Sequence, residues 1–313
     1  MNRFLQEVLE GLNAKSKHLH SKYFYDESGD KIFQQIMAAD EYYLTNCENE
    51  IFEEQTSALA TTLKNGFNSF DFVELGAGDA TKSSHLLKEL VAQETDFNYF
   101  PIDISSHVID DLETNLPKSI PSLKVKGFNG EYFEMLEETC NVSKRRKVVL
   151  FLGSNIGNMP VTDAKLFCEN LRKHLAPTDL VLIGFDLKKN PRVIRAAYND
   201  KDGFTKEFNL NLLRRMNKEL GADFDLDAFE HYPSYDPLTG SCKSYLMSLK
   251  KQAVAFADID VIHFEENEAV FMEISQKYSV NETENLAKET GFKPVKHFFD
   301  HKNWFLDTVW ECV

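Results

Sequence analysis

The chain has 313 residues, of which 42% are hydrophobic, and its 25 Phe and 11 Tyr are typical of a globular protein with a substantial core. Its formal net charge of −15 argues against a sequence-independent nucleic-acid binder, which needs Lys and Arg to neutralise phosphates. No apolar run approaches the length that spans a bilayer, so a membrane-embedded protein is excluded as well.

The five cysteines are scattered, with no CxxC pair and no histidine at metal-ligand spacing. We therefore expect free thiols in a reducing compartment and no metal site. The first 20 residues carry acidic side chains among their apolar positions and lack the apolar core of a signal peptide. These features predict a cytoplasmic protein.

Residues 1–65 have apolar side chains at three- and four-residue spacing, which predicts helices. After an amphipathic opening stretch, the pattern is clearest in GDKIFQQIMAAD (29–40) and NCENEIFEEQTSALATTL (46–63). The aromatic-rich segment SKYFYDESGD (21–30) ends in turn residues and is expected to connect two helices.

Residues 66–189 alternate between short apolar runs and helical patterns. The five runs predict strands: FDFVEL (70–75), FNYFPIDI (97–104), LKVKGF (123–128), KVVLFLG (147–153) and LVLIGFD (180–186). Strands separated by helices of about 10–15 residues predict a parallel sheet with helices on both faces. This part of the chain is therefore expected to be an α/β domain.

Residues 190–279 break that rhythm and read as an inserted α+β segment. Two helical stretches (191–200 and 203–220) lead to turn-rich HYPSYDPLTGS (231–241) and to strands around 244–251, 260–264 and 271–278. The tail, 280–313, returns to the earlier pattern, with a helix for which Asn281 is the expected N-cap and two closing strands.

The segment VELGAGDATKSS (73–84) follows the first strand of the alternating zone. Gly76 and Gly78 allow a tight turn into a helix, which places backbone N–H groups at the carboxyl edge of the sheet. The dinucleotide fingerprint needs a third glycine where Thr81 stands. Asp103 ends the second strand, where a carboxylate can accept from both ribose hydroxyls. This pattern favours S-adenosylmethionine, with a nicotinamide cofactor or a purely connecting turn as alternatives.

The segment FMEISQKY (271–278) alternates apolar and polar residues, as a strand with two different faces does. Met272 and Ile274 are expected on one face, and Glu273 and Ser275 on the other. The polar face can meet water, or it can form the wall of a pocket that holds a ligand through a carboxylate and a hydroxyl.

Several segments together resemble the histidine-specific methyltransferases of ergothioneine biosynthesis, which trimethylate the α-amino group of L-histidine with S-adenosylmethionine. They are YFYDESGDKIFQQI (23–36), DEYYLTNCE (40–48), VELGAGDATKSS, FLGSNIGNM (151–159), the segment 195–231 and FMEISQKY. The resemblance implies a Rossmann-like class I methyltransferase domain (66–189 and 280–313) with a second, smaller α+β substrate domain (1–65 and 190–279).

Residue roles follow from the resemblance position by position. The implied S-adenosylmethionine site contains Gly76, Gly78, Lys82, Asp103, Glu131 and Tyr132. Lys82 is expected to reach the methionine carboxylate. Glu131 is expected to accept from the adenine amino group, although the family has Asp-Phe where this chain has Glu131-Tyr132.

The implied substrate site contains Tyr25, Tyr42, Gly153, Asn158, Tyr198, Phe208, Ser244, Glu273 and Ser275. Asn158 is expected to orient both the α-amino and the α-carboxylate group, because an amide donates and accepts at once. The resemblance also makes Asn158 and Tyr42 the expected catalytic residues. Glu273 and Ser275 match the pair that binds the imidazole ring, so the polar face of the strand is expected to be a pocket wall.

Two positions depart from the family pattern and leave the substrate open. Asn155 stands where the family commonly has Thr, and Ser244 where it often has Met beside the substrate ring. An N-methyltransferase of another amino acid, such as one with an indole or a modified imidazole, is therefore an alternative, as is a non-catalytic protein that binds the cofactor. We expect a monomer that acts on a small molecule, without nucleic-acid or membrane partners.

Overall fold

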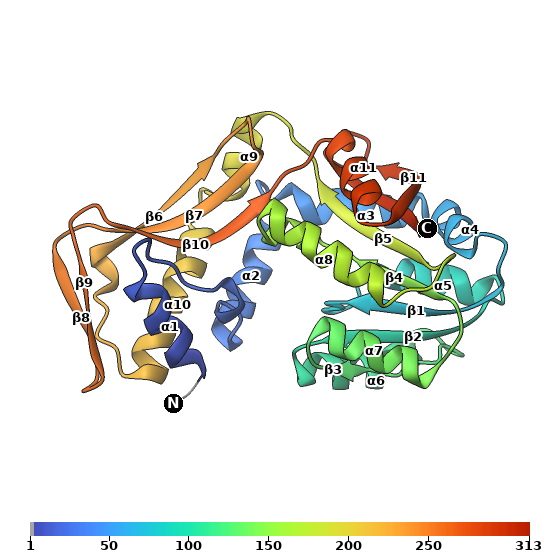
Figure 1. Cartoon of the computed structure of the whole chain (residues 1–313), viewed down its shortest axis with the longest axis horizontal. Helices are drawn as coiled ribbons and strands as arrows, with labels where there is room; N and C mark the ends of the chain where they lie inside the picture. Colours follow the sequence, from blue (N-terminus) through green and yellow to red (C-terminus); the bar gives the residue numbers. More distant parts are fainter. Residues whose placement is uncertain (1–2) are drawn as a thin grey trace. The chain divides into compact units, whose positions relative to one another are not determined.

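The computed structural model describes residues 3–313, and the chain divides into two compact units. Unit 1 runs to Tyr43 and resumes at Lys189–Gln276, while unit 2 consists of Leu44–Lys188 and Lys277–Val313. The helices and strands of both units are labelled in Figure 1. Over residues 3–313, no helix combines the length and the apolar character needed to cross a membrane. None of the five cysteines, all within this range, forms a disulfide.

Unit 2 is built on a seven-stranded sheet in the order β11-β12-β5-β4-β1-β2-β3. The parallel strands are β1 (Ser69–Leu75), β2 (Asp96–Asp103), β3 (Phe128–Asn129), β4 (Lys147–Phe151) and β5 (Leu180–Asp186). Two antiparallel strands, β12 (Phe305–Cys312) and β11 (Phe292–Phe299), extend the sheet beyond β5. The α/β class and the Rossmann-like domain predicted from the sequence are confirmed.

Four helices connect successive parallel strands of unit 2: α5 (Ser83–Ala92), α6 (Ser106–Ser119), α7 (Tyr132–Val142) and α8 (Val161–Lys173). They cover both faces of the sheet (Figure 1), which is why β4 and β5 are buried at every position. The strand order reverses between β1 and β4. In open α/β sheets ligands bind outside the carboxyl ends of the strands at such a point, and here Gly76 follows β1 and Gly153 follows β4.

The first domain boundary differs from the one expected near residue 65, because the chain enters unit 2 at Leu44. Helices α3 (Tyr43–Glu54) and α4 (Thr56–Lys64) therefore belong with the Rossmann-like sheet. Ile51, Phe52 and Leu59 are fully buried, and α4 packs along α5. Helical periodicity identifies the apolar face of such a helix but not the surface that this face covers.

Unit 1 combines helices with a three-stranded antiparallel sheet, β10-β7-β6, and a separate hairpin, β8–β9. Its helices are α1 (Arg3–Asn13), α2 (Glu27–Ala38), α9 (Pro191–Ala197) and α10 (Phe204–Leu220), with short 3₁₀ turns at Ser21–Tyr23 and Leu226–Ala228. Its strands are β6 (Phe229–Tyr235), β7 (Ser241–Ser248), β8 (Gln252–Phe256), β9 (Asp260–Phe264) and β10 (Ala269–Gln276). One apolar core joins α1, α10, β7 and β10.

Three expected elements differ in detail. In LKVKGF only Phe128 belongs to β3, while Val125 forms an isolated parallel bridge with Tyr99 of β2. The turn-rich HYPSY (231–235) is part of β6. Helix α11 (Val280–Glu289) has Ser279 as its N-cap rather than Asn281, since the Ser279 hydroxyl and the Glu282 carboxylate form a capping box.

The chain leaves unit 2 and re-enters it at adjacent positions. Leu187 forms a parallel bridge with Tyr278, and the Lys188 amide donates to the Tyr278 carbonyl at 2.8 Å. Beside this bridge, Lys277 Nζ lies 2.6 Å from Asp186 Oδ2, and both side chains are fully buried. The two segments at which the chain leaves and re-enters unit 2 are therefore held together by backbone pairing and by a buried ion pair.

Candidate functional site

The glycine turn after β1 has the geometry that the sequence predicts. Gly76 and Gly78 have φ values of +71° and +52°, in the region that favours glycine. A Cβ on Gly76 would lie 2.8 Å from the Tyr132 hydroxyl, so the turn also requires the absence of a side chain. The Gly76 amide donates to the carbonyl of Ile102 at 2.8 Å, which ties the turn to the end of β2.

Asp103 lies beside this turn. Its Oδ2 accepts from the Gly78 amide at 3.2 Å and its Oδ1 from the Ser105 amide at 2.9 Å. A carboxylate has about four acceptor positions, so both oxygens can still accept from a ribose diol. Burial, together with the nearby charges of Asp103 and Glu131, raises the pKa of Tyr132 to about 12. Glu131 itself is exposed at the N-cap of α7.

Glu74 precedes the turn on β1 and is buried. Its carboxyl accepts a hydrogen bond from the Tyr99 hydroxyl at 2.6 Å. Burial raises the pKa of Glu74 to about 7, even though the hydrogen bonds from Tyr99 and Ser83 favour the ionised form. A titratable carboxyl thus lies on β1 two residues before the glycine turn.

Lys82 is the N-cap of α5 and connects the turn after β1 with the loop after β4. Its Nζ forms an ion pair with Glu48 Oε2 and would lie 3.5 Å from a Cβ on Gly153. The side chain of Lys82 is 25% exposed, whereas that of Glu48 is 1% exposed. Sequence reasoning did not assign a role to Glu48, although it ends the motif DEYYLTNCE.

The loop GSNIGN forms a 3₁₀ turn, η2 (Asn155–Asn158), directly after β4. Gly153 and Ser154 both have positive φ, and the Ser154 hydroxyl accepts from the Asp186 amide at 3.0 Å, which supports this backbone. Asn158 is exposed, and its Nδ2 lies 3.4 Å from Asn155 Oδ1. Asn155 Nδ2 would in turn lie 3.7 Å from a Cβ on Gly76. Asn155 therefore lies between the glycine turn and Asn158.

In unit 1, Glu273 and Ser275 lie on the face of the sheet that continues into the core. The register pairs are Val270 with Leu246, Glu273 with Ser244, and Ser275 with Cys242. The three β7 residues are two apart, and directly paired residues share a face. Val270, Glu273 and Ser275 therefore all point to the same face, which contains the core residues Val270 and Leu246.

A β-bulge makes this possible. Val270 and Glu273 are three residues apart and would face opposite ways in a regular strand, but the register shifts between Phe271 and Glu273. The simple alternation expected for FMEISQKY is therefore wrong at Met272, which the register skips and which is buried in the same core as Val270. The alternation holds again from Glu273 onward.

The predicted substrate residues of unit 1 form a connected set. The Tyr198 hydroxyl lies 2.7 Å from Ser275 Oγ, and the Tyr198 ring lies 6.3 Å from that of Tyr42. Further edge-to-face and tilted contacts run from Tyr42 through Phe33 to Phe208 and Tyr25, with centroid separations of 5.5–6.4 Å. Phe33 on α2 joins the others but was not predicted, because at its position in GDKIFQQI it reads as an ordinary core residue.

Ser244 and Ser275 are 1% and 7% exposed, whereas Tyr25 is 48% exposed. The set thus runs from a buried polar end to an exposed aromatic end. Such a gradient fits a small ligand whose polar ring is enclosed.

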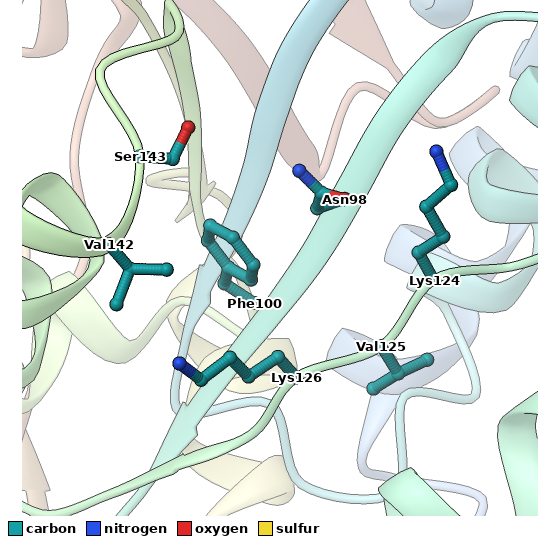
Figure 2. Close-up of a pocket in the computed structure, with 7 residues that line it drawn as sticks. All are labelled: Asn98, Phe100, Lys124, Val125, Lys126, Val142 and Ser143. Carbon is teal, nitrogen blue, oxygen red and sulfur yellow. The ribbon is translucent and has the colours of Figure 1, made fainter.

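A surface depression elsewhere in unit 2 is a separate feature (Figure 2). Asn98 and Phe100 of β2, residues 124–126 and the end of α7 at Val142 and Ser143 line it. Lys124 pairs with Asp96 at 3.5 Å, and the Lys126 ammonium lies over the Phe128 ring. None of the predicted cofactor or substrate residues lines this depression.

The unit 2 residues fit S-adenosylmethionine: Asp103 offers a carboxylate for the ribose, the turn after β1 has two glycines with positive φ, and Lys82 offers an ammonium for an amino-acid carboxylate. Comparisons with known proteins agree. Residues 4–312 match the model of a family described as histidine-specific, SAM-dependent methyltransferases.

Two relatives are named for different substrates. A histidine N-alpha-methyltransferase of Mycolicibacterium smegmatis is 31% identical over 94% of this chain and 90% of its own length. An L-tryptophan methyltransferase of Psilocybe serbica is 27% identical over 94% of this chain and 89% of its own length. Among solved structures, a magnesium protoporphyrin IX methyltransferase of Synechocystis aligns with 94% of this chain and 97% of its own, at 10% identity and a TM-score of 0.46. The family match covers nearly the whole chain, which therefore belongs to the histidine-specific, S-adenosylmethionine-dependent methyltransferases.

Proposed function

We propose that the protein transfers methyl groups from S-adenosylmethionine to the α-amino group of L-histidine and continues to the trimethylated betaine. The observation that carries this proposal is the placement of Glu273 and Ser275 on the core-directed face of β10, where Glu273 pairs with Ser244 and the Ser275 hydroxyl lies 2.7 Å from that of Tyr198. A carboxylate and a hydroxyl on one enclosed face complement a ring with two polar nitrogens. The name and coverage of the mycolicibacterial relative support the same substrate.

The proposed ring site works through paired hydrogen bonds. The Glu273 carboxylate accepts from one imidazole N–H, and Ser275 meets the other ring nitrogen. The hydrogen bond with Tyr198 holds the Ser275 hydroxyl in place. Amino acids whose side chains cannot form hydrogen bonds with these groups are disfavoured in kcat/KM by factors that can reach ~10⁴, because unpaired buried polar groups are costly.

The proposed amino-acid site uses Asn158, with its amide placed by Asn155, to orient the α-amino and α-carboxylate groups. The bound cofactor supplies the electrophilic methyl group. The substrate ammonium must first lose its proton, which we assign to solvent, reached through the Tyr42 hydroxyl. Alignment of the amine for in-line attack can contribute ~7–11 kcal/mol to lowering the barrier.

The aromatic set supports repeated methylation. Each transfer enlarges the ammonium and spreads its charge over methyl groups, and the faces of Tyr42, Tyr198 and Phe208 can contact such a cation. Cation–π contacts contribute ~0.5–2 kcal/mol each, more where water is excluded. This favours release of the product only after the third methyl group is added.

Methylation of another aromatic amino acid is the second candidate, because Ser244 lies directly opposite Glu273 and is small. The tryptophan methyltransferase of Psilocybe serbica shows that such a substrate occurs among similar chains. An indole offers one N–H, which Glu273 could accept, but it offers nothing to Ser275.

The test is incubation with S-adenosylmethionine and each of the twenty amino acids singly, with products measured by mass. We expect histidine to gain three methyl groups. The Glu273→Gln variant should lose ~5- to 15-fold in kcat/KM for histidine, because a hydrogen bond to a charged group is replaced by a neutral one.

Glu230→Gln is the matched control, since Glu230 lies exposed on β6, on the opposite face of the same sheet. Preference for tryptophan would select the second candidate. No gain of mass on any amino acid would contradict both.

A further inference from the structure

Glu48 joins three separate segments at the carboxyl edge of the unit 2 sheet. From α3, its Oε1 and Oε2 lie 2.8 Å and 3.0 Å from the Gly153 amide, and its Oε2 also pairs with the Lys82 ammonium. The carboxylate is 1% exposed. One buried group therefore fixes both the start of the loop after β4 and the cation at the start of α5.

Gly184 on β5 leaves room for the Glu48 carboxylate. Asp307 on β12 pairs in register with Gly184 on β5. A Cβ on Gly184 would lie 2.5 Å from Glu48 Oε1 and 3.1 Å from Asp307 Oδ1. The missing side chain of Gly184 thus leaves the space in which two carboxyl groups approach each other.

Asp307 is fully buried, and no donor within residues 3–313 lies at hydrogen-bond distance from either of its oxygens. Burial, reinforced by the charge of Glu48, raises the pKa of Asp307 well above its usual range. Burial thus favours the neutral form of Asp307, and the Glu48 carboxylate is the negative partner of Lys82 in the ion pair. Although burial alone would lower it, the pKa of Lys82 is held above its usual value by that charge.

A buried ion pair is weak evidence for a role in stability, because removing the charges from water offsets the attraction between them. In this pair the Glu48 side chain is enclosed, whereas the Lys82 side chain is 25% exposed. An ammonium has three donors, so Lys82 can bind Glu48 and a second acceptor at the same time. The pair therefore holds the Lys82 ammonium beside Gly153, at the start of the loop after β4.

We propose that Glu48 is a positioning residue for the amino-acid end of the cofactor: it holds Lys82 Nζ where it can receive the methionine carboxylate, and it fixes the Gly153 backbone at the start of the neighbouring loop. The inference rests on the cofactor role of Lys82 in the proposed function.

The test compares two ligands that differ in the methionine end. S-adenosylhomocysteine carries the carboxylate, and adenosine does not. In Glu48→Gln the amide oxygen can still accept from Gly153, but its NH₂ group faces Lys82 and displaces it. We expect the Kd for S-adenosylhomocysteine to rise about 10- to 100-fold, as for loss of a charge-assisted contact, with the Kd for adenosine little changed. Glu53→Gln on the same helix is the control, since the Glu53 side chain is 60% exposed.

A double-mutant cycle with Lys82→Met shows whether Glu48 acts through Lys82. In that background Glu48→Gln should have no further effect on the Kd for S-adenosylhomocysteine. The double variant also lacks the buried pair, so it remains measurable if the single variant folds poorly.

Equal loss of both ligands in Glu48→Gln, or an unchanged Kd for S-adenosylhomocysteine, would overturn the inference. Neither result depends on which amino acid is methylated. Failure of the twenty-amino-acid assay, in contrast, would remove the proposed substrate and leave the ligand measurements standing.

Discussion

The two units place different chemistry in their candidate sites. Unit 2 contains buried ionisable groups, including Glu48, Glu74, Asp186, Lys277 and Asp307, together with the partly exposed Lys82. Unit 1 offers aromatic rings and hydroxyls, with Glu273 as the one carboxylate of the predicted set. Charges arranged in advance suit a cofactor with an ionised amino-acid end, and rings with hydroxyls suit a polar heterocycle. The comparison implies that unit 2 depends more strongly on buried charge.

The largest effect is expected at the crossing of the chain in unit 2. Lys277→Met removes the ammonium beside the fully buried Asp186 and should lower the free energy of unfolding by ~3–5 kcal/mol. Lys188→Met is the control, because Lys188 pairs with Glu282 at the surface, where such a pair contributes ~0–1 kcal/mol. Urea denaturation measures both.

Equal losses for the two lysine variants would show that burial of the pair does not matter. A double variant, Lys277→Met with Asp186→Leu, should recover much of the stability, since no buried charge then remains.

Glu74 makes the stability of unit 2 depend on pH. Its pKa is raised from 4.5 to about 7, so the folded protein holds this proton more tightly than the unfolded chain does. The resulting stabilisation is fully present below pH ~4.5 and is lost as pH rises to ~7, by up to about 3 kcal/mol. Glu74→Gln, which keeps a neutral group, should therefore become more stable relative to the wild type across this window. Denaturation at pH 4.5, 5.5 and 7 gives the difference, and a constant difference would contradict the assignment.

His231 makes unit 1 respond in the opposite direction. It is 8% exposed on β6, and burial lowers its pKa from 6.5 to about 4. Its stabilisation is present above pH ~6.5 and is lost as pH falls toward 4, by up to about 3 kcal/mol. His231→Leu should lose less stability than the wild type on acidification over that range. The two variants together separate the units, because their pH-dependent differences from the wild type have opposite signs.

The features that could be predicted from the sequence are those set by neighbouring residues. The parallel strands, the glycine turn and Asp103 follow from apolar periodicity and local spacing. The ion pair of Glu48 with Lys82 joins residues 34 positions apart, and the space over Gly184 depends on α3 and β12 together. Such contacts arise only after the sheet is assembled, so no local pattern indicates them.

In unit 1, prediction from the sequence meets the same limit within a single strand. The alternation in FMEISQKY identified the Glu273–Ser275 pair, but its direction depends on the bulge at Met272 and on the register with β7. The family resemblance supplied these residues because it carries three-dimensional information that alternation lacks. The domain boundary was expected near residue 65 but lies at Leu44. The reason is related: the apolar face of α3 does not reveal which core it joins.

The smallest effect is expected from Tyr198→Phe, which removes the hydroxyl 2.7 Å from Ser275 Oγ and leaves the ring contact with Tyr42 in place. A neutral hydrogen bond contributes ~0.5–1.5 kcal/mol, so kcat/KM for histidine should fall about 2- to 12-fold. Tyr232→Phe is the control, because Tyr232 is 56% exposed on β6. Since the lost hydroxyl orients Ser275, the fall in kcat/KM should be larger for histidine than for an amino acid whose ring forms no hydrogen bond with Ser275. An equal loss for every substrate would mean that Tyr198 acts at the amino-acid end instead, and that the ring is read by Glu273 alone.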